Sequence, residues 1–268
     1  MYQFPKPSMA ERENYERENP PHKLLEDMLR DSKRVVFFGG AGVSTESGIP
    51  DFRSANGVYS EKYGELSPET IISRSFFDRE PEMFYKFYRH KLIYENAKPN
   101  AAHIKLAELE AAFHDAGKTL TVITQNIDGL HQSAGSTNVI ELHGSVLRNF
   151  CMKCHKRFDL SAVTDTSQPV PLCPDCGGII KPDVVLYEES LDEYNIERAV
   201  EEISNADTLI IAGTSLIVYP AAGFVRYFKG RHSAIINLSP SDRDMLTELV
   251  VREKVGELFS KIDVSKCV

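Results

Sequence analysis

Short apolar runs recur along the chain, and segments with helical character lie between them. Residues 33–38 end in a Val-Val-Phe-Phe run that stops at Gly39 and Gly40, a profile typical of a buried parallel strand. Comparable runs rich in Val, Ile and Leu occupy residues 120–124, 139–142, 208–212 and 234–238. Strands that alternate with helices predict an α/β fold, here a Rossmann-like parallel sheet covered on both faces.

The clearest predicted helix begins after Pro99. Asn100 is a suitable N-cap, and Gly117 ends the segment. One apolar face is formed between them by Ala102, Leu106, Leu109 and Phe113. Further helices are expected at 193–204, 221–228 and 255–262.

Two stretches interrupt the alternation and predict a smaller inserted helical and zinc-binding domain. Residues 60–117 are helical without strands, and Phe84, Phe87, Tyr88 and Leu92 are spaced to form one packed face. Residues 147–182 contain two cysteine pairs and few regular patterns. The expected organisation is a polar tail at 1–20, a Rossmann-like domain at 21–60, 118–146 and 183–268, a helical insert at 61–117 and a zinc-binding module at 147–182.

Composition adds limits on partners and location. The net charge of -8 argues against nucleic acid as a partner, because a phosphate-binding protein normally has a basic face. No apolar run approaches the roughly 20 residues that span a bilayer, and the N-terminus lacks a secretory signal. No membrane partner is therefore expected, and the predicted location is the cytoplasm.

Four of the five cysteines form the pattern C-x2-C-x18-C-x2-C. Two close thiolate pairs with this spacing predict one tetrahedral zinc site, and disulfides are disfavoured in a reducing compartment. Four thiolates leave no open coordination position, so the expected metal is structural. The ligands are Cys151, Cys154, Cys173 and Cys176, while Cys267 lies outside the pattern and is expected to be a frayed terminal thiol.

A glycine-rich loop follows the first predicted strand at residues 39–48. Glycines there let the backbone approach a pyrophosphate, and the N–H groups of a following helix attract its charge. The dinucleotide fingerprint is incomplete, because Thr45 replaces its third glycine and no obvious acidic residue lies about 20 residues further on, after a second strand. A hydride-transfer enzyme is therefore a poor match. The next residues include Phe52 and Arg53, which are suited to cover a ring and pair with phosphate or ribose oxygens.

Polar residues also follow the next two strands. Asn126 and Asp128 come after residues 120–124, at the edge where α/β proteins bind ligands, although a simple capped turn would use the same residues. His143 follows residues 139–142, and an imidazole near neutral pKa is suited to accept a proton. His131 is the nearest competing histidine.

Three segments together carry a resemblance to a known family. GAGVSTESGIPDFRS at 40–54, TQNIDGLH at 124–131 and LHG at 142–144 resemble the sirtuin family of NAD-dependent protein deacylases. The resemblance implies that NAD is a co-substrate and that acetyl groups are removed from protein lysines. The implied products are nicotinamide, O-acetyl-ADP-ribose and free lysine. It also implies that His143 is the general base and that Asn126 and Asp128 are catalytic partners.

The resemblance extends to the binding residues. It implies NAD contacts from Gly40, Ala41, Gly42, Thr45, Asp51, Phe52, Arg53, Gln125, Asn126, Ile127, Asp128, His143, Gly213, Thr214, Ser215, Asn237, Leu238 and Lys254. It implies that acyl-lysine peptides or proteins pair as an added strand with segments containing Val185, Tyr187, Glu189 and Val218. Glu188 departs from the family pattern, which has an aromatic residue, a glycine and a glutamate at 187–189.

Acyl preference and alternative reactions complete the predictions. Family members that prefer acidic acyl groups carry Tyr-x-x-Arg, whereas this chain has Tyr85 and Tyr88 at that spacing and Arg89 one residue later. An acetyl or other uncharged acyl group is therefore expected. A mono-ADP-ribosyltransferase would share the NAD site, but His143 favours deacylation, which requires activation of the ribose 2'-hydroxyl. A non-enzymatic zinc-ribbon interaction protein is disfavoured by the acidic charge balance.

Overall fold

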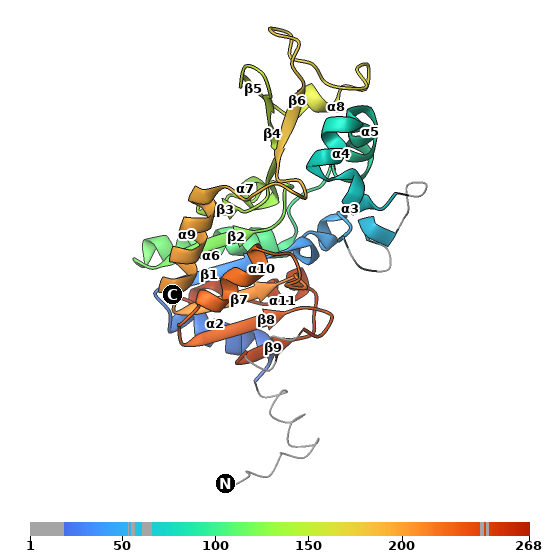
Figure 1. The fold of residues 1–268 in the computed structure, drawn as a ribbon. Helices are drawn as coiled ribbons and strands as arrows, with labels where there is room; N and C mark the ends of the chain where they lie inside the picture. Colours follow the sequence, from blue (N-terminus) through green and yellow to red (C-terminus); the bar gives the residue numbers. More distant parts are fainter. Residues whose placement is uncertain (1–18, 53, 55–56, 61–65, 242–243, 245–246) are drawn as a thin grey trace.

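The computed structural model describes residues 19–52, 54, 57–60, 66–241, 244 and 247–268. Two lobes are visible in Figure 1, a larger one built on a six-stranded sheet and a smaller one around a three-stranded sheet. The larger sheet has the order β3-β2-β1-β7-β8-β9, and all its pairings are parallel. This arrangement confirms the predicted α/β fold with a parallel sheet.

The strands of the large sheet lie close to the predicted apolar runs. They are β1 (Arg34–Gly39), β2 (Thr119–Thr124), β3 (Val139–Glu141), β7 (Thr208–Ala212), β8 (His232–Ile236) and β9 (Leu249–Val251). The sixth strand, β9, was missed because three residues on a sheet edge give too short a pattern to recognise.

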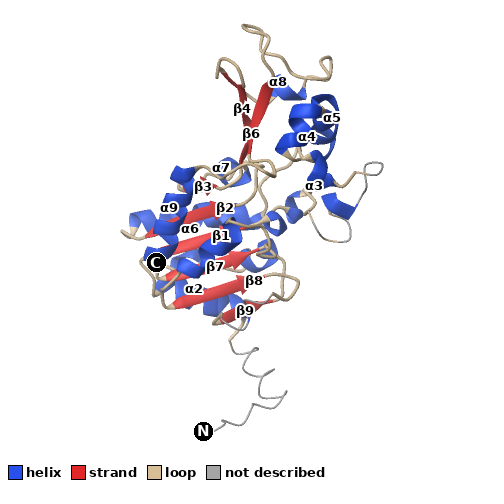
Figure 2. Cartoon of the chain, in the orientation of Figure 1, coloured by secondary structure: helices blue, strands red, loops and turns tan. Residues whose placement is uncertain are grey.

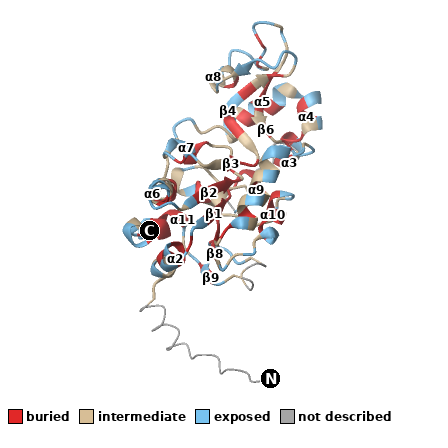
Figure 3. Ribbon diagram, turned by 90° about the vertical axis from the view of Figure 1, so that its left-hand side faces the viewer, coloured by how far each residue is buried: buried red, intermediate tan, exposed pale blue. Residues whose placement is uncertain are grey.

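Helices cover both faces of this sheet (Figure 2). Alternation along β1 explains the two layers, since Val35 and Phe37 belong to one apolar cluster and Val36 and Phe38 to another. The first cluster includes residues of α2 (Pro21–Arg30), α6 (Ala101–Asp115) and α11 (Val255–Phe259). The second includes residues of α9 (Glu193–Asn205), α10 (Ala221–Phe224) and the 3-10 turn η4 (Val225–Tyr227). The buried strands between these layers are visible in Figure 3.

Helix α6 packs in a different place from the one expected from the sequence, where residues 61–117 were grouped as a helical insert. Its apolar face packs on the large sheet with β1 and β2. The predicted N-cap is confirmed, since the Asn100 side chain accepts a hydrogen bond from the Ala102 N–H at 2.9 Å. The amide of Asn100 also donates to the Val43 carbonyl oxygen at 2.8 Å. The start of α6 is therefore fastened to the glycine-rich loop.

The small lobe has one shared core. Its strands are β4 (Gly144–Cys151), β5 (Arg157–Phe158) and β6 (Ile180–Val184), and its helices are α3 (Pro68–Ile71), α4 (Arg74–Arg79), α5 (Pro81–Lys91) and α8 (Ser161–Thr164). The predicted packed face of α5 is confirmed, because Phe84, Phe87 and Tyr88 are buried against Ile180 and Val184. The helical insert and the cysteine module therefore fold against each other.

The C-terminus corrects one expectation. Cys267 is fully buried in the core of the large lobe, and its Sγ lies 3.4 Å from the Asp263 carbonyl oxygen. It is a packed core residue rather than a frayed thiol, because the 3-10 turn η6 (Val264–Lys266) folds the chain end back onto α2 and α6. Among the described residues, no helix has the length and apolar character needed to cross a bilayer.

Candidate functional site

The strand order places a topological switch point between β1 and β7. From β1 the chain proceeds to β2 and β3 on one side, while β7 to β9 continue on the other. Loops leave two such neighbouring strands in opposite directions and open a crevice at their carboxyl ends, where α/β proteins bind ligands. A cavity of about 350 Å³ lies there, lined by residues that follow β1, β2, β7 and β8.

The glycine-rich loop occupies one wall of this cavity in a form that the sequence did not predict. Two short 3-10 turns, η1 (Ala41–Val43) and η2 (Thr45–Ser47), follow β1 instead of an α-helix. The Gly40 and Gly42 N–H groups donate to the carbonyl oxygens of Ala212 and Gly213, at 3.1 and 2.8 Å. These two amides hold the loop against β7, so they are not donors for a phosphate.

Most of the residues expected to contact NAD meet at this cavity. Gly40, Ala41, Gly42, Thr45, Asp51, Phe52, Gln125, Asn126, His143, Gly213, Thr214, Ser215, Asn237, Leu238 and Lys254 line it. Ile127 and Asp128 instead line a second cavity of about 240 Å³, which shares Ala41, Phe52 and Asn126 with the first. Arg53 lies outside the described residues.

Side chains at the ends of three strands are linked by hydrogen bonds. The Gln125 amide donates to the Thr214 hydroxyl at 3.1 Å. The Asn237 side chain pairs with the Thr214 backbone, accepting from its N–H at 3.0 Å and donating to its carbonyl oxygen at 2.9 Å. Asn237 therefore fixes the turn after β7, and its amide is already engaged in a contact that no sequence pattern indicated.

Ser44 joins the two polar residues of the second sequence block. Its hydroxyl donates to the Asp128 carboxylate at 2.7 Å and accepts from the Asn126 side-chain amide at 2.9 Å. Asp128 also accepts from the Leu130 N–H at 2.9 Å, so part of the capped-turn interpretation holds. Ser44 is nearly inaccessible to solvent. Ser44 lies within the GAGVSTESG string, but nothing in the string distinguishes it from the neighbouring hydroxyl residues.

His143 lines the cavity, and one hydrogen bond determines which of its ring nitrogens carries the hydrogen. Its Nδ1 is 2.9 Å from the Gln125 carbonyl oxygen. Because a carbonyl oxygen only accepts, Nδ1 carries the hydrogen and Nε2 keeps its lone pair. Burial lowers the pKa of His143 below its ordinary value, against the smaller opposing effect of this hydrogen bond. The ring is therefore neutral near pH 7 and has one nitrogen able to accept a proton.

His131, the competing histidine, lies in the core instead. It is 1% exposed, lines neither of the two cavities described above, and packs edge-on against His103 with ring centroids 4.7 Å apart. Within the described structure, neither of its ring nitrogens has a hydrogen-bond partner. Burial lowers the pKa of His131 to about 3, and the neighbouring His103 lowers it further. Such a ring is a packing residue.

Only one of the four expected peptide-binding residues lines the cavity. Val218 does so, between the turn after β7 and α10. Val185, Tyr187 and Glu189 belong to the segment after β6, which lies between the two lobes. Tyr187 is 36% exposed, whereas the Glu189 side chain turns inward and pairs with the buried Lys181 at 3.1 Å.

Several cavity residues were missed by the sequence analysis. Glu253 and Ser241 line the far wall, in loops whose composition is ordinary and carries no motif. Glu46 does not line the cavity itself, but its carboxylate accepts a hydrogen bond from the Gly256 N–H, at the start of α11, at 2.6 Å. This contact joins the glycine-rich loop to the loop that carries Lys254.

The four predicted metal ligands are brought together. The Sγ atoms of Cys151, Cys154, Cys173 and Cys176 all lie within 4.8 Å of one another. Two of the separations are 3.4 and 3.7 Å. A tetrahedral zinc site with Zn–S bonds near 2.3 Å requires sulfur separations of about 3.8 Å, so the cluster fits the ion. The end of β4 and the loop before β6, which carry these cysteines, lie at the end of the small lobe away from the large sheet (Figure 1), and the cysteines line neither cavity.

Fold and site together define a class of protein, an α/β protein with a four-cysteine cluster suited to zinc and a cavity at the switch point of a parallel sheet. The Sir2 family model matches residues 40–220. An NAD-dependent protein deacetylase of Clostridium perfringens (strain 13 / Type A) is 55% identical over 240 residues, covering 89% of this chain and 96% of that protein. The corresponding protein of Cutibacterium acnes (strain DSM 16379 / KPA171202) is 48% identical over 239 residues, or 89% of this chain and 96% of its own. The chain belongs to the Sir2 family.

Solved structures agree with this assignment. Sir2 bound to an acetylated peptide has a TM-score of 0.75 and 37% identity, covering 88% of this chain and 94% of its own. A Sir2 complex with a p53 peptide and NAD+ has a TM-score of 0.75 and 38% identity, with coverages of 88% and 95%.

The buried histidine pair predicts a specific acid sensitivity. An unfolded histidine has a pKa of about 6.5, whereas burial lowers the folded pKa of both His103 and His131. The unfolded state thus binds more protons below pH ~6.5, and the free energy of unfolding should fall as pH drops from there toward the lowered values. Replacing His131→Phe should flatten this slope in urea titrations at several pH values, whereas the exposed His114→Phe should leave it unchanged. An unaltered slope in His131→Phe would contradict the assignment.

Zinc removal should loosen the small lobe selectively. Chelation removes the zinc ion that joins the two cysteine pairs. Amides near the pairs, such as those of Cys151 and Cys173, should therefore exchange hydrogen faster. Amides in β1 and β7 should keep their protection. As a matched pair, Cys173→Ser should lose bound zinc in metal analysis, while Cys267→Ser should retain it. Equal exchange increases in both lobes would contradict a local structural role.

Proposed function

We propose that this chain is an NAD-dependent protein deacetylase in which His143 acts as general base. The observation that most directly supports this role is the state of the His143 ring. The ring is neutral, is held by the Gln125 carbonyl oxygen and lines the switch-point cavity. The relatives named NAD-dependent protein deacetylase support the activity, and the geometry supports the residue.

NAD supplies, when bound, a ribose carbon that becomes electrophilic as nicotinamide leaves, together with a 2'-hydroxyl that becomes a nucleophile. His143 accepts the proton of that hydroxyl at Nε2, since Nδ1 is occupied. One water molecule is consumed when the carbon–nitrogen bond to lysine breaks, so that lysine leaves as the free amine and the acetyl group ends on ADP-ribose. The residues that follow β1, β2, β7 and β8 hold the co-substrate along the cavity.

Asn126 and Asp128 orient polar groups at the reacting end. Both contact the Ser44 hydroxyl, and Asn126 borders both cavities. The Ser44 contact fixes the Asn126 amide, leaving its carbonyl oxygen on the side away from Ser44. Phe52 also borders both cavities and packs on Tyr59 with ring centroids 5.3 Å apart, a position from which it excludes water.

The preferred acyl group is acetyl or another uncharged group. Arg89, the cation nearest the Tyr-x-x-Tyr spacing, donates to the carbonyl oxygens of Val163 at 2.6 Å and Gln168 at 2.9 Å. Tyr85 is fully buried, and its hydroxyl donates to the Ile180 carbonyl oxygen. Both side chains therefore support the small lobe, and neither is free to pair with an acidic acyl group.

The four-cysteine zinc ion supports the small lobe and takes no part in the chemistry. We place the protein in the cytoplasm because thiolate zinc ligands persist in a reducing compartment. The domain division proposed from the packing assigns α6 to the NAD-binding lobe and joins the helical and cysteine modules into one lobe.

The decisive experiment follows nicotinamide, O-acetyl-ADP-ribose and free lysine from NAD and an acetyl-lysine peptide. His143→Ala should lower kcat by about 10²–10⁴-fold, the range for loss of a general base, without losing the fold. His114→Ala, exposed on α6, is the control. Activity of the unmodified protein should fall as acid protonates His143, below pH ~6.5, and be level above it. Transfer of label from NAD to protein without free lysine would instead indicate ADP-ribosylation.

Matched acetyl- and succinyl-lysine peptides test the acyl preference. The acetyl peptide should have the higher kcat/KM by about tenfold or more, a difference of ~1.4 kcal/mol in transition-state binding. The physical reason is that Arg89 is already bound to backbone carbonyls. A preference for the succinyl peptide would overturn the choice.

A further inference from the structure

The segment 185–189, which we call the substrate segment, is fastened to both lobes. At its start the Val185 N–H donates to the His143 carbonyl oxygen at 3.0 Å. In its middle, Tyr187 pairs with the chain before α4, donating to the Ile72 carbonyl oxygen at 3.1 Å and accepting from the Arg74 N–H at 2.9 Å. The segment therefore connects the backbone of the proposed base to the first turn of α4.

Glu188 has an unusual backbone conformation within this segment. Its φ is 75°, in the left-handed region that residues with a Cβ rarely adopt. The family resemblance leads one to expect glycine at this position, and glycine would adopt this φ without strain. A glutamate here costs free energy that some contact of its side chain must offset.

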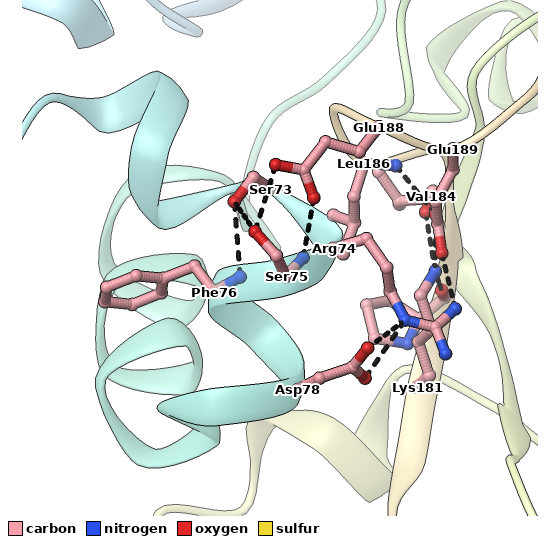
Figure 4. A network of polar contacts seen from close by, with 11 residues as sticks. Ser73, Arg74, Ser75, Phe76, Asp78, Lys181, Val184, Leu186, Glu188 and Glu189 are labelled. Carbon is pink, nitrogen blue, oxygen red and sulfur yellow. Dashed lines mark hydrogen bonds and ion pairs between the residues drawn. The ribbon is translucent and has the colours of Figure 1, made fainter.

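That contact is with Ser75 in the first turn of α4 (Figure 4). One carboxylate oxygen of Glu188 accepts from the Ser75 N–H at 2.8 Å, and the other accepts from the Ser75 hydroxyl at 3.0 Å. N–H groups in the first turn of a helix lack intrahelical partners, and an ionised acceptor makes a strong hydrogen bond to them. We call this pair of bonds the Glu188–Ser75 latch.

The neighbouring glutamate holds the same segment from the inside. Glu189 accepts from Arg74 at 2.9 Å, from the buried Lys181 at 3.1 Å and from the Leu186 N–H at 2.9 Å. In Figure 4 the two carboxylates point in different directions, with Glu189 toward Lys181 on β6 and Glu188 toward Ser75 on α4. The Glu189 contacts fix the turn within the segment, whereas the latch adds a side-chain tie to the helical part of the small lobe.

We propose that Glu188 is a positioning residue for the protein substrate, and that its latch to Ser75 holds the substrate segment in the shape that pairs with an acetyl-lysine peptide. The inference rests on the proposed function, since it assumes that this segment binds the peptide backbone. A segment fixed before binding loses less conformational freedom when the peptide pairs with it, so the latch strengthens peptide binding. The NAD cavity is lined by other residues, and neither Glu188 nor Ser75 is among them.

The test measures peptide KM, NAD KM and kcat for the full chain carrying Glu188→Gly, Ser75→Ala or both. Glu188→Gly removes the latch together with the strain, and peptide KM should rise on the order of tenfold, the effect of losing a hydrogen bond to a charged group. NAD KM and kcat should stay within about twofold. Ser75→Ala should raise peptide KM less, because the Ser75 N–H bond remains. Its effect should vanish in the double variant, since the bond it removes is already absent.

Two further variants separate positioning from general stability. Glu188→Gln keeps one acceptor oxygen without the charge, so its peptide KM should fall between those of the unmodified protein and Glu188→Gly. Glu197→Gln, at an exposed position of α9, is the control and should change nothing. The free energy of unfolding of Glu188→Gly should be nearly unchanged, because freeing this exposed segment is a local opening that leaves the core of the small lobe in place. An unchanged peptide KM in Glu188→Gly, or equal effects of Ser75→Ala in both backgrounds, would overturn the proposal.

A readout independent of activity distinguishes failure of this inference from failure of the proposed function. The Val185 and Tyr187 amides should exchange hydrogen faster in Glu188→Gly than in the unmodified protein, and addition of the acetyl-lysine peptide should slow them in both. If the unmodified protein bound the peptide but released no free lysine with NAD, the proposed function would be wrong, whereas the amide-exchange results would still support the Glu188–Ser75 latch. If the peptide left these amides unaffected, the positioning role would fail even in an active deacetylase.

Discussion

Gly42 and Gly213 meet where β1 and β7 end, joined by a backbone hydrogen bond of 2.8 Å. A Cβ on Gly42 would lie 2.7 Å from the Gly213 Cα, and one on Gly213 would lie 2.4 Å from the Val43 nitrogen. No side chain fits on either residue, so the two loops can cross closely only as glycines. Because this crossing lies at the switch point, it sets where the cavity opens and which strand ends surround it.

Backbone groups hold several of the polar side chains of the site. The Gln125 carbonyl oxygen selects the tautomer of His143, and the Thr214 backbone holds Asn237. Each of these side chains is thus held by backbone groups at the end of a strand, and the sheet determines where that end lies. Ser44 extends the same principle, since the glycine crossing places its hydroxyl between Asn126 and Asp128.

The small lobe connects the zinc cluster, the helical insert and the substrate segment through one core. Strand β4 ends in the ligand Cys151, and β6 follows the ligands Cys173 and Cys176 in the chain. At their other ends the two strands pass beside His143, where Gly144 pairs with Val184. A Cβ on Gly144 would lie 1.9 Å from the Asp183 carbonyl oxygen, so the strands converge closely beside His143. We propose that a zinc ion held by these cysteines acts at a distance, by keeping the strands together, while the Glu188–Ser75 contact holds the adjacent segment to α4.

The sequence by itself determined five of the six strands of the large sheet, the four cysteine ligands and most of the residues that line the cavity, because each depends on local spacing or on a contiguous motif. Val-rich runs predict buried strands, and paired thiols predict zinc regardless of what surrounds them. Only the tertiary structure decided that α6 packs on the large sheet, that Cys267 is buried, that His131 is core and that Glu188 reaches Ser75. These outcomes depend on contacts between residues far apart in the chain, which periodicity and spacing do not encode.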